Sequence, residues 1–286
     1  MRRRSFSKVK KRDRIRFGRI VTLITLMTLF VIGLLFIYAG LTDGINRYIA
    51  AAPLPAITES AQLSKMEVNS DIKEEPTRFQ GQVRKVAYIT FDDGPSDYTD
   101  SILDILREYD VKATFFMIGQ HLNQHKDAVK RLVEEGSYPG LHSISHDYNT
   151  LYKSGSSKSF IEEFTKEQEM VKDIVGFTPM LIRAPYGSSP QIDEAFRGDI
   201  AAAGFKMWDW TIDSLDWNLP GQPNKVVEQV KSSLRWDKEV ILLHEREQTV
   251  QALPRILDLL KEKGYQIEAY DPNGHFSANF GHDQRL

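Results

Sequence analysis

The chain has 286 residues, 41% of them hydrophobic, and no cysteine, which permits one large globular domain and excludes a fold that depends on disulfides. The formal net charge is only -2, but the first 19 residues hold ten of the 37 Lys and Arg side chains and one of the 39 acidic ones. The remainder carries 27 basic and 38 acidic residues, so nonspecific nucleic-acid binding, which requires a basic surface, is excluded.

The N-terminal region predicts a membrane anchor. After the basic head, residues 1–19, come twenty uncharged residues (IVTLITLMTLFVIGLLFIYA), enough to cross about 30 Å of hydrocarbon as a helix. We therefore expect a transmembrane anchor over residues 20–41. Cations precede the apolar run and none follows it closely, which places the N-terminus in the cytoplasm and everything after the anchor outside the cell. The alternative is a cleaved signal peptide, but its apolar core usually has only about 7–15 residues.

The rest of the chain predicts a stalk, a domain and a tail. Residues 42–84 are polar and contain three prolines, which favours an extracytoplasmic stalk. We expect the domain over residues 85–272 and a polar tail over residues 273–286. Within the domain, apolar β-branched runs predict strands at residues 86–91, 113–118, 138–142, 180–183, 205–212, 240–244 and 265–269.

Helical segments lie between the predicted strands. Ile102 and Leu106, Phe160 and Phe164, and Ile256 and Leu260 are spaced four residues apart, as on one face of a helix. Such alternation of strands and helices indicates an α/β fold with parallel strands, either a (β/α) barrel or a doubly wound open sheet. Catalytic groups of both folds gather at the carboxyl ends of the strands.

Two aspartates end the first predicted strand, before a Gly-Pro turn. Asp92 and Asp93 are adjacent carboxylates, and crowded carboxylates keep their charges together only when a cation is near. Taken alone, the Asp-Asp-Gly-Pro sequence is also ordinary turn chemistry.

Two histidines follow the third predicted strand. His142 and His146 are four residues apart, so on a helical turn both imidazoles face one way and can bind one cation, although this spacing is often structural. One aspartate and two histidines make three ligands that suit zinc or a similar first-row divalent ion, with a position left for water.

Three further polar motifs also stand at strand ends, in RAPYG, DSLDW and ILLHE. Together with TFDDGPS and HSISH, their order and spacing resemble the five motifs of the polysaccharide deacetylase family, also called the NodB-homology domain or carbohydrate esterase family 4. The resemblance spans residues 85 to about 270 and implies a distorted (β/α) barrel rather than an open sheet. Leu141 and Glu245 depart from residues that are frequent in this family, at positions without a catalytic role.

The resemblance also implies a role for each motif residue. Asp93, His142 and His146 are the implied metal ligands, Asp92 the general base and Arg183 the partner that keeps Asp92 ionised. His244 is the implied general acid, oriented by Asp216. The implied substrate contacts are Trp217 and Leu242 around the acetyl methyl group and the backbone N–H of Tyr186 at the oxyanion.

These roles predict an extracytoplasmic hydrolase that removes acetyl groups from an N-acetylated glycan. We expect one divalent ion, zinc before cobalt, nickel or manganese, and peptidoglycan N-acetylglucosamine as the substrate. We expect no nucleic-acid partner and no obligate protein partner. The alternatives are deacetylation of exported poly-N-acetylglucosamine or chito-oligosaccharide, an O-acetyl esterase of the xylan type, and an inactive anchored protein that only binds glycan.

Overall fold

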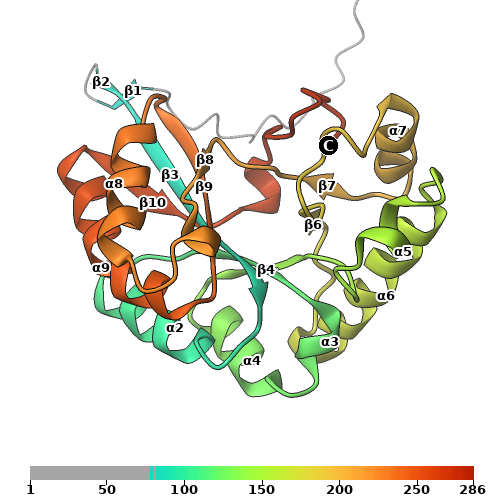
Figure 1. The fold of residues 1–286 in the computed structure, drawn as a ribbon, viewed down its shortest axis with the longest axis horizontal. Helices are drawn as coiled ribbons and strands as arrows, with labels where there is room; N and C mark the ends of the chain where they lie inside the picture. Colours follow the sequence, from blue (N-terminus) through green and yellow to red (C-terminus); the bar gives the residue numbers. More distant parts are fainter. Residues whose placement is uncertain (1–77, 80–81) are drawn as a thin grey trace, which may run out of the picture. The chain divides into compact units, whose positions relative to one another are not determined.

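The computed structural model describes residues 78–79 and 82–286 (Figure 1). The predicted basic head, the anchor and most of the stalk lie outside these residues. Among the helices that the structure describes, none has the length and apolar character needed to span a membrane.

Eight parallel strands form one curled sheet, preceded by a short antiparallel hairpin of β1 (Arg78–Phe79) and β2 (Gln82–Val83). The sheet runs β7-β6-β5-β4-β3-β9-β8, with β10 also paired to β3. The strands are β3 (Lys85–Gly94), β4 (Thr114–Met117), β5 (Tyr138–Leu141), β6 (Leu181–Ile182), β7 (Lys206–Met207), β8 (Ile212–Asp213), β9 (Lys238–His244) and β10 (Tyr265–Glu268).

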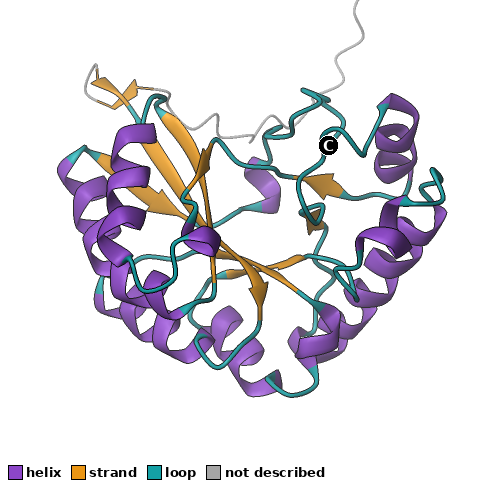
Figure 2. Cartoon of the chain, in the orientation of Figure 1, coloured by secondary structure: helices purple, strands orange, loops and turns teal. Residues whose placement is uncertain are grey.

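The sheet curls into a half-barrel (Figure 2), which agrees with the distorted (β/α) barrel that the resemblance implied. In the described part of the chain, β7 and β8 end the sheet and do not pair with each other. The single strand predicted over residues 205–212 is split into these two short strands. Between these two strands, the carbonyls of Trp208 and Asp209 accept hydrogen bonds from the side chain of Arg183 and not from a neighbouring strand.

Strand β3 is the centre of the sheet. Its first residues, Lys85 to Tyr88, pair with β10, and residues from Thr90 to Gly94 pair with β4 on the same edge. Its other edge pairs with β9 from Val86 to Asp92. Since both edges and most side chains of β3 are buried, its carboxyl end is a rigid place from which to present Asp92 and Asp93.

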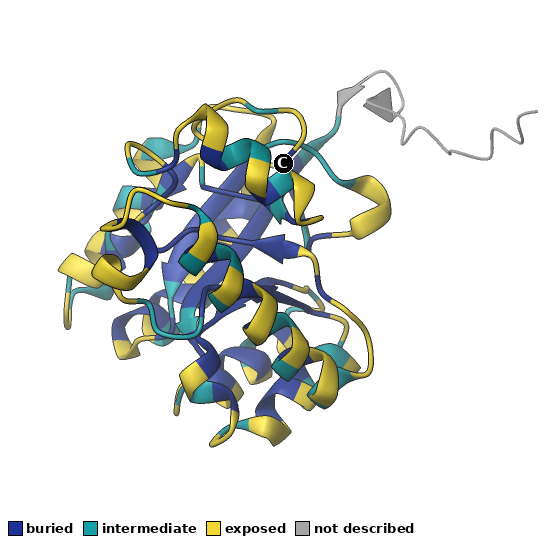
Figure 3. Cartoon of the chain, turned by 90° about the vertical axis from the view of Figure 1, so that its right-hand side faces the viewer, coloured by how far each residue is buried: buried dark blue, intermediate teal, exposed yellow. Residues whose placement is uncertain are grey.

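Helices cover the outer face of the sheet, and their apolar faces are buried as the sequence predicted (Figure 3). Ile102 and Leu106, Phe160 and Phe164, and Ile256 and Leu260 all belong to the main hydrophobic core. The helices are α2 (Thr99–Glu108), α3 (Gly119–Leu122), α4 (Lys126–Glu134), α5 (Tyr148–Tyr152), α6 (Lys158–Val175), α7 (Glu194–Ala202), α8 (Pro223–Ser233) and α9 (Glu247–Glu262), with 3-10 turns η1 (Asp216–Asn218) and η2 (Pro272–Gly274).

Residues 273–286, for which the sequence predicted a polar tail, are packed against the domain. Trp208, which follows β7, pairs with Ala278 in a parallel bridge and donates its indole N–H to the carbonyl of Phe276 over 2.8 Å. The side chain of Leu286 is fully buried. The folded domain therefore extends to Leu286, and this segment lines the edge at which a closed barrel would continue.

Candidate active site

The two aspartates lie at a bulge at the end of β3. The register between β3 and β4 shifts between Asp92 and Gly94, and Asp93 has a left-handed backbone with φ of 69°. Successive side chains of a regular strand point to opposite faces, and a bulge can re-aim one of them. This irregularity lets both carboxylates face the same cavity at the carboxyl end of the sheet.

The two histidines are brought together by a loop and not by the helical turn that the sequence predicted. His142 follows β5 directly, and no helix includes the segment up to His146. Ser143 and His146 have left-handed φ angles of 71° and 52°. The two imidazole rings nevertheless lie 4.9 Å apart, because the loop folds back on itself.

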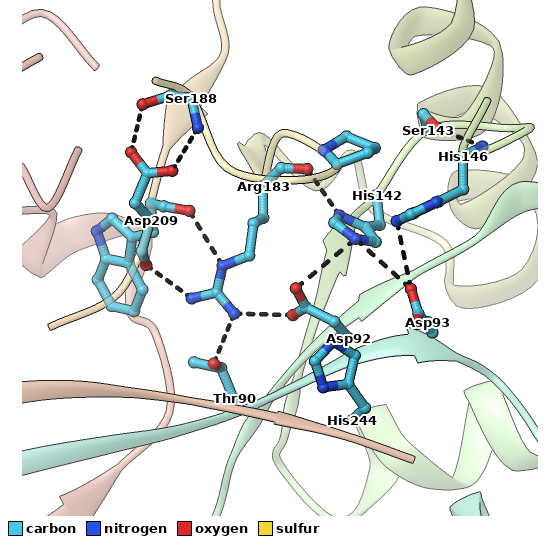
Figure 4. Close-up of polar contacts among 12 residues, drawn as sticks. Thr90, Asp92, Asp93, His142, Ser143, His146, Arg183, Ser188, Asp209 and His244 are labelled. Atoms are coloured by element: carbon cyan, nitrogen blue, oxygen red, sulfur yellow. Dashed lines mark hydrogen bonds and ion pairs between the residues drawn. The ribbon is translucent and has the colours of Figure 1, made fainter. Parts of the chain in front are cut away.

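Asp93, His142 and His146 form a cluster that fits a divalent ion (Figure 4). Asp93 Oδ1 lies 3.7 Å from His142 Nε2 and 3.5 Å from His146 Nε2. These separations are long for hydrogen bonds but close to the roughly 3.4 Å expected between two ligands of one tetrahedral zinc ion. Asp93 Oδ1 is buried and has no hydrogen-bond partner in the described part of the chain, as expected for an atom reserved for a cation.

The ionisation of the cluster also suits a metal. The carbonyl of Arg183 lies 2.8 Å from His142 Nδ1, and since a carbonyl can only accept, Nδ1 carries the proton and Nε2 keeps its lone pair toward Asp93. Burial lowers the pKa of His142 and favours its neutral form. Burial raises the pKa of Asp93, but the neighbouring imidazoles, His142 first, outweigh it and the net pKa is lowered.

Arg183 and Asp92 form a buried ion pair beside this cluster (Figure 4). Arg183 Nη1 lies 2.8 Å from Asp92 Oδ1, and the arginine side chain is fully buried. The guanidinium also donates to the hydroxyl of Thr90 and to the carbonyls of Trp208 and Asp209. The second carboxylate oxygen, Asp92 Oδ2, is left facing His142 Nε2 at 3.6 Å. One oxygen of Asp92 is thus fixed and the other is available to accept a proton.

His244, at the end of β9, lies beside Asp216 on η1. Asp216 Oδ1 lies 2.7 Å from His244 Nδ1, and Asp216 Oδ2 accepts the backbone N–H of His244 at the same distance. Burial lowers the pKa of His244, but the hydrogen bond and negative charge of Asp216 outweigh burial, so its net pKa is raised. The imidazole can therefore hold a proton on Nε2, the nitrogen that Asp216 does not engage.

A cavity of about 460 Å³ joins these groups at the carboxyl ends of the strands. Eight of the ten predicted site residues line it, and the other two, Arg183 and Asp216, hydrogen-bond to Asp92 and His244 in its wall. Its lining residues are Asp92, Asp93, His142, His146, Ala184, Tyr186, Trp210, Asp213, Trp217, Leu242 and His244. Trp217 and Tyr186 are half exposed, whereas Leu242 is buried.

The predicted oxyanion contact is the backbone N–H of Tyr186. Tyr186 has a left-handed φ of 67°, and its hydroxyl donates to the carbonyl of His146 over 3.0 Å. Within the described residues its own backbone N–H has no hydrogen-bond acceptor. This donor is consequently free to bind an oxygen atom of a ligand.

Sequence reasoning missed several polar residues of the site. Asp209 is buried, with its carboxylate bonded to the backbone N–H groups of Ser188 and Phe280. Burial raises the pKa of Glu167 well above its ordinary value, although the backbone N–H groups of His142 and Ser143 oppose this effect. Neither residue belongs to one of the five motifs. The available signals of burial were that Asp209 lies within an apolar run and that Glu167 lies on an apolar face of a helix.

Comparison with known proteins agrees with the resemblance. The family model described as polysaccharide deacetylase matches residues 80–208. A peptidoglycan-N-acetylglucosamine deacetylase of Bacillus cereus is 44% identical over 233 residues, covering 79% of this chain and 83% of the relative. A putative polysaccharide deacetylase of Bacillus subtilis, YheN, is 38% identical over 214 residues, covering 73% and 75%. The crystal structure of polysaccharide deacetylase Bc1974 from Bacillus cereus superposes with a TM-score of 0.69 at 44% identity, covering 71% of this chain and 100% of that one.

Proposed function

The chain belongs to the polysaccharide deacetylase family and is a hydrolase of amide bonds, and on this premise we propose that it is a metal-dependent deacetylase of peptidoglycan N-acetylglucosamine. One observation carries the proposal. A three-ligand cluster lies in one cavity between a carboxylate fixed by a buried arginine and a histidine held by a buried aspartate. A protein that only binds glycan has no need of this acid–base pair.

In the proposed reaction the chain's own residues bind the acetyl group and move two protons. A divalent ion held by Asp93, His142 and His146 supplies acidification of water and polarisation of the acetyl carbonyl. Asp92 Oδ2 accepts a proton from the attacking water while Arg183 holds Oδ1.

The remaining groups complete the cleavage. The backbone N–H of Tyr186 donates to the developing oxyanion, and Trp217 and Leu242 enclose the acetyl methyl group. His244 Nε2 then donates its proton to the departing amine, so that the C–N bond breaks and acetate and a free amino sugar are released. Protonation matters more for an amine than for the alcohol that an O-acetyl ester releases, which favours the amide substrate.

The proton of His244 leads to a prediction about pH. Because the general acid must be protonated and Asp216 raises the pKa of His244, activity should be lost as pH rises through that raised pKa. Asp216→Asn removes the charge, so burial then dominates and the alkaline limb of kcat/KM should move to lower pH. At alkaline pH we expect a loss of about tenfold or more, within the range of general acid catalysis. An unchanged alkaline limb would assign the acid to another group.

The choice of peptidoglycan rests on the Bacillus cereus relative and on the proposed anchor, which would hold the domain in the layer next to the membrane. Deleting the gene should remove deacetylated muropeptides from a mass-spectrometric digest of the wall and should increase sensitivity to lysozyme. Re-expression of the intact chain should restore both, and the Asp92→Asn variant should restore neither. An unchanged muropeptide profile with more highly acetylated exported poly-N-acetylglucosamine would make the exopolysaccharide the substrate.

The proposed location is the cell membrane, with a single pass and the domain outside. Its support is the apolar run of residues 20–39 behind a basic head. Protease added to protoplasts should digest the domain and spare the head. Protection of the domain until the membrane is permeabilised would contradict this orientation.

A further inference from the structure

Helix α6 carries two glutamates for which the proposed reaction has no use. Glu163 and Glu167 are four residues apart, so their side chains lie on one face of the helix. This face is turned to the loop from His142 to His146. Glu167 is fully buried, which is rare for a carboxyl group that is not paired with a cation.

Both carboxyl groups bind backbone N–H groups of this loop. Glu167 Oε1 accepts the backbone N–H of His142 over 3.2 Å, and the backbone N–H groups of His142 and Ser143 both act to lower the pKa of this carboxyl group against the effect of burial. Glu163 Oε2 accepts the backbone N–H of Ser145 over 3.0 Å, and its two oxygens lie 2.8 and 2.9 Å from the hydroxyl of Ser145. The two glutamates thus bind His142 and Ser145, at the start of the five-residue loop and next to its end.

The loop is held from the opposite side as well. The backbone N–H of Gly119 donates to the carbonyl of Ser143 over 3.0 Å, and that of Gln120 donates to the carbonyl of Ile144 over 3.2 Å. Its N–H groups are therefore held by α6 and its carbonyls by the start of α3. Outside support is needed, because Ser143 and His146 adopt left-handed φ angles that are unfavourable for residues other than glycine.

Stability alone does not explain the choice of glutamate at position 167. Glu167 Oε2 is buried and has no hydrogen-bond partner in the described part of the chain. Burying such an atom is unfavourable, so the carboxyl group makes the protein less stable than a fully satisfied acceptor would. What the carboxyl group of Glu167 does contribute is a hydrogen bond that fixes the start of the loop at His142.

We propose that Glu163 and Glu167 are positioning residues that hold the His142–His146 loop so that both imidazoles face Asp93, and that they thereby set the affinity for the metal ion. The proposal rests on the proposed metal-dependent function. Groups that orient metal ligands typically contribute about 10- to 100-fold to metal affinity. Neither glutamate contacts the substrate or the reacting atoms in the proposed reaction.

The test measures the affinity of the full chain for Co²⁺ and Zn²⁺ by competition with a chelator, together with the melting temperature of the metal-free protein. Glu167→Leu and Glu163→Ala should each weaken binding of both ions by about tenfold or more. Glu167→Gln retains the accepting oxygen and should stay within about threefold of the wild type. Glu169→Ala, at an exposed position of the same helix, is the matched control and should have no effect.

The outcomes separate this inference from the proposed function. Should Glu167→Leu fail to fold, Glu163→Ala still tests the idea, because Glu163 is only partly buried. A lower melting temperature with unchanged metal affinity in the folded variants would show a merely structural role and overturn the inference. If the wild-type chain itself binds neither ion, the proposed function fails first.

Discussion

Asp92→Asn should reduce turnover by about 10²- to 10⁴-fold, the usual contribution of a general base, while metal content stays nearly unchanged. Asparagine has almost the same shape as aspartate but cannot accept the proton of the attacking water. Asp92 is not one of the three clustered ligands, so their arrangement should persist. The measurement is steady-state deacetylation of a chito-oligosaccharide, with bound metal determined on the same sample.

Two controls make this result interpretable. Asp97→Asn changes an exposed aspartate just beyond the same turn and should retain full activity. The variant at Asp92 also leaves Arg183 buried without a charged partner, so the melting temperature should be recorded and activity expressed per folded molecule. A loss below roughly tenfold in the folded Asp92→Asn protein would mean that another group is the base.

Removing the metal should abolish turnover, which is the second large effect. The proposed ion would have no substitute among the described side chains at the cavity, because Asp92 alone is a weak base for free water. Exhaustive chelation should eliminate acetate release, and stoichiometric Zn²⁺ or Co²⁺ should restore it. His142→Ala removes one nitrogen ligand and should prevent restoration.

The nature of the ligands supplies a further control for this experiment. Two imidazoles and one carboxylate suit zinc or cobalt, whereas magnesium prefers oxygen ligands, so Mg²⁺ should not restore turnover. Undiminished turnover of a protein shown by elemental analysis to be free of metal would contradict the metal-dependent mechanism.

The sequence by itself determined the class of fold and most of the cavity. Apolar runs placed β3, β4, β5, β9 and β10, and helical spacing placed α2, α6 and α9, because the pattern of apolar residues is a local property of each element. The carboxyl ends of parallel strands meet at one edge of the sheet, so motifs at the ends of β3, β5 and β9 had to converge. Asp93, His142 and His146 do lie together as this geometry required.

Only the tertiary structure decided how these side chains are aimed and held. The bulge at Asp93 and the left-handed residues Ser143 and His146 are permitted by contacts from other elements, which no local pattern encodes. Glu167 reaches the backbone of His142 across 25 positions of sequence. At the edge of the sheet beyond β7, Ala278 pairs with Trp208, a long-range contact that neither segment's sequence pattern indicates. Local periodicity identifies elements, whereas ligand orientation and barrel closure depend on hydrogen bonds between residues far apart in the chain.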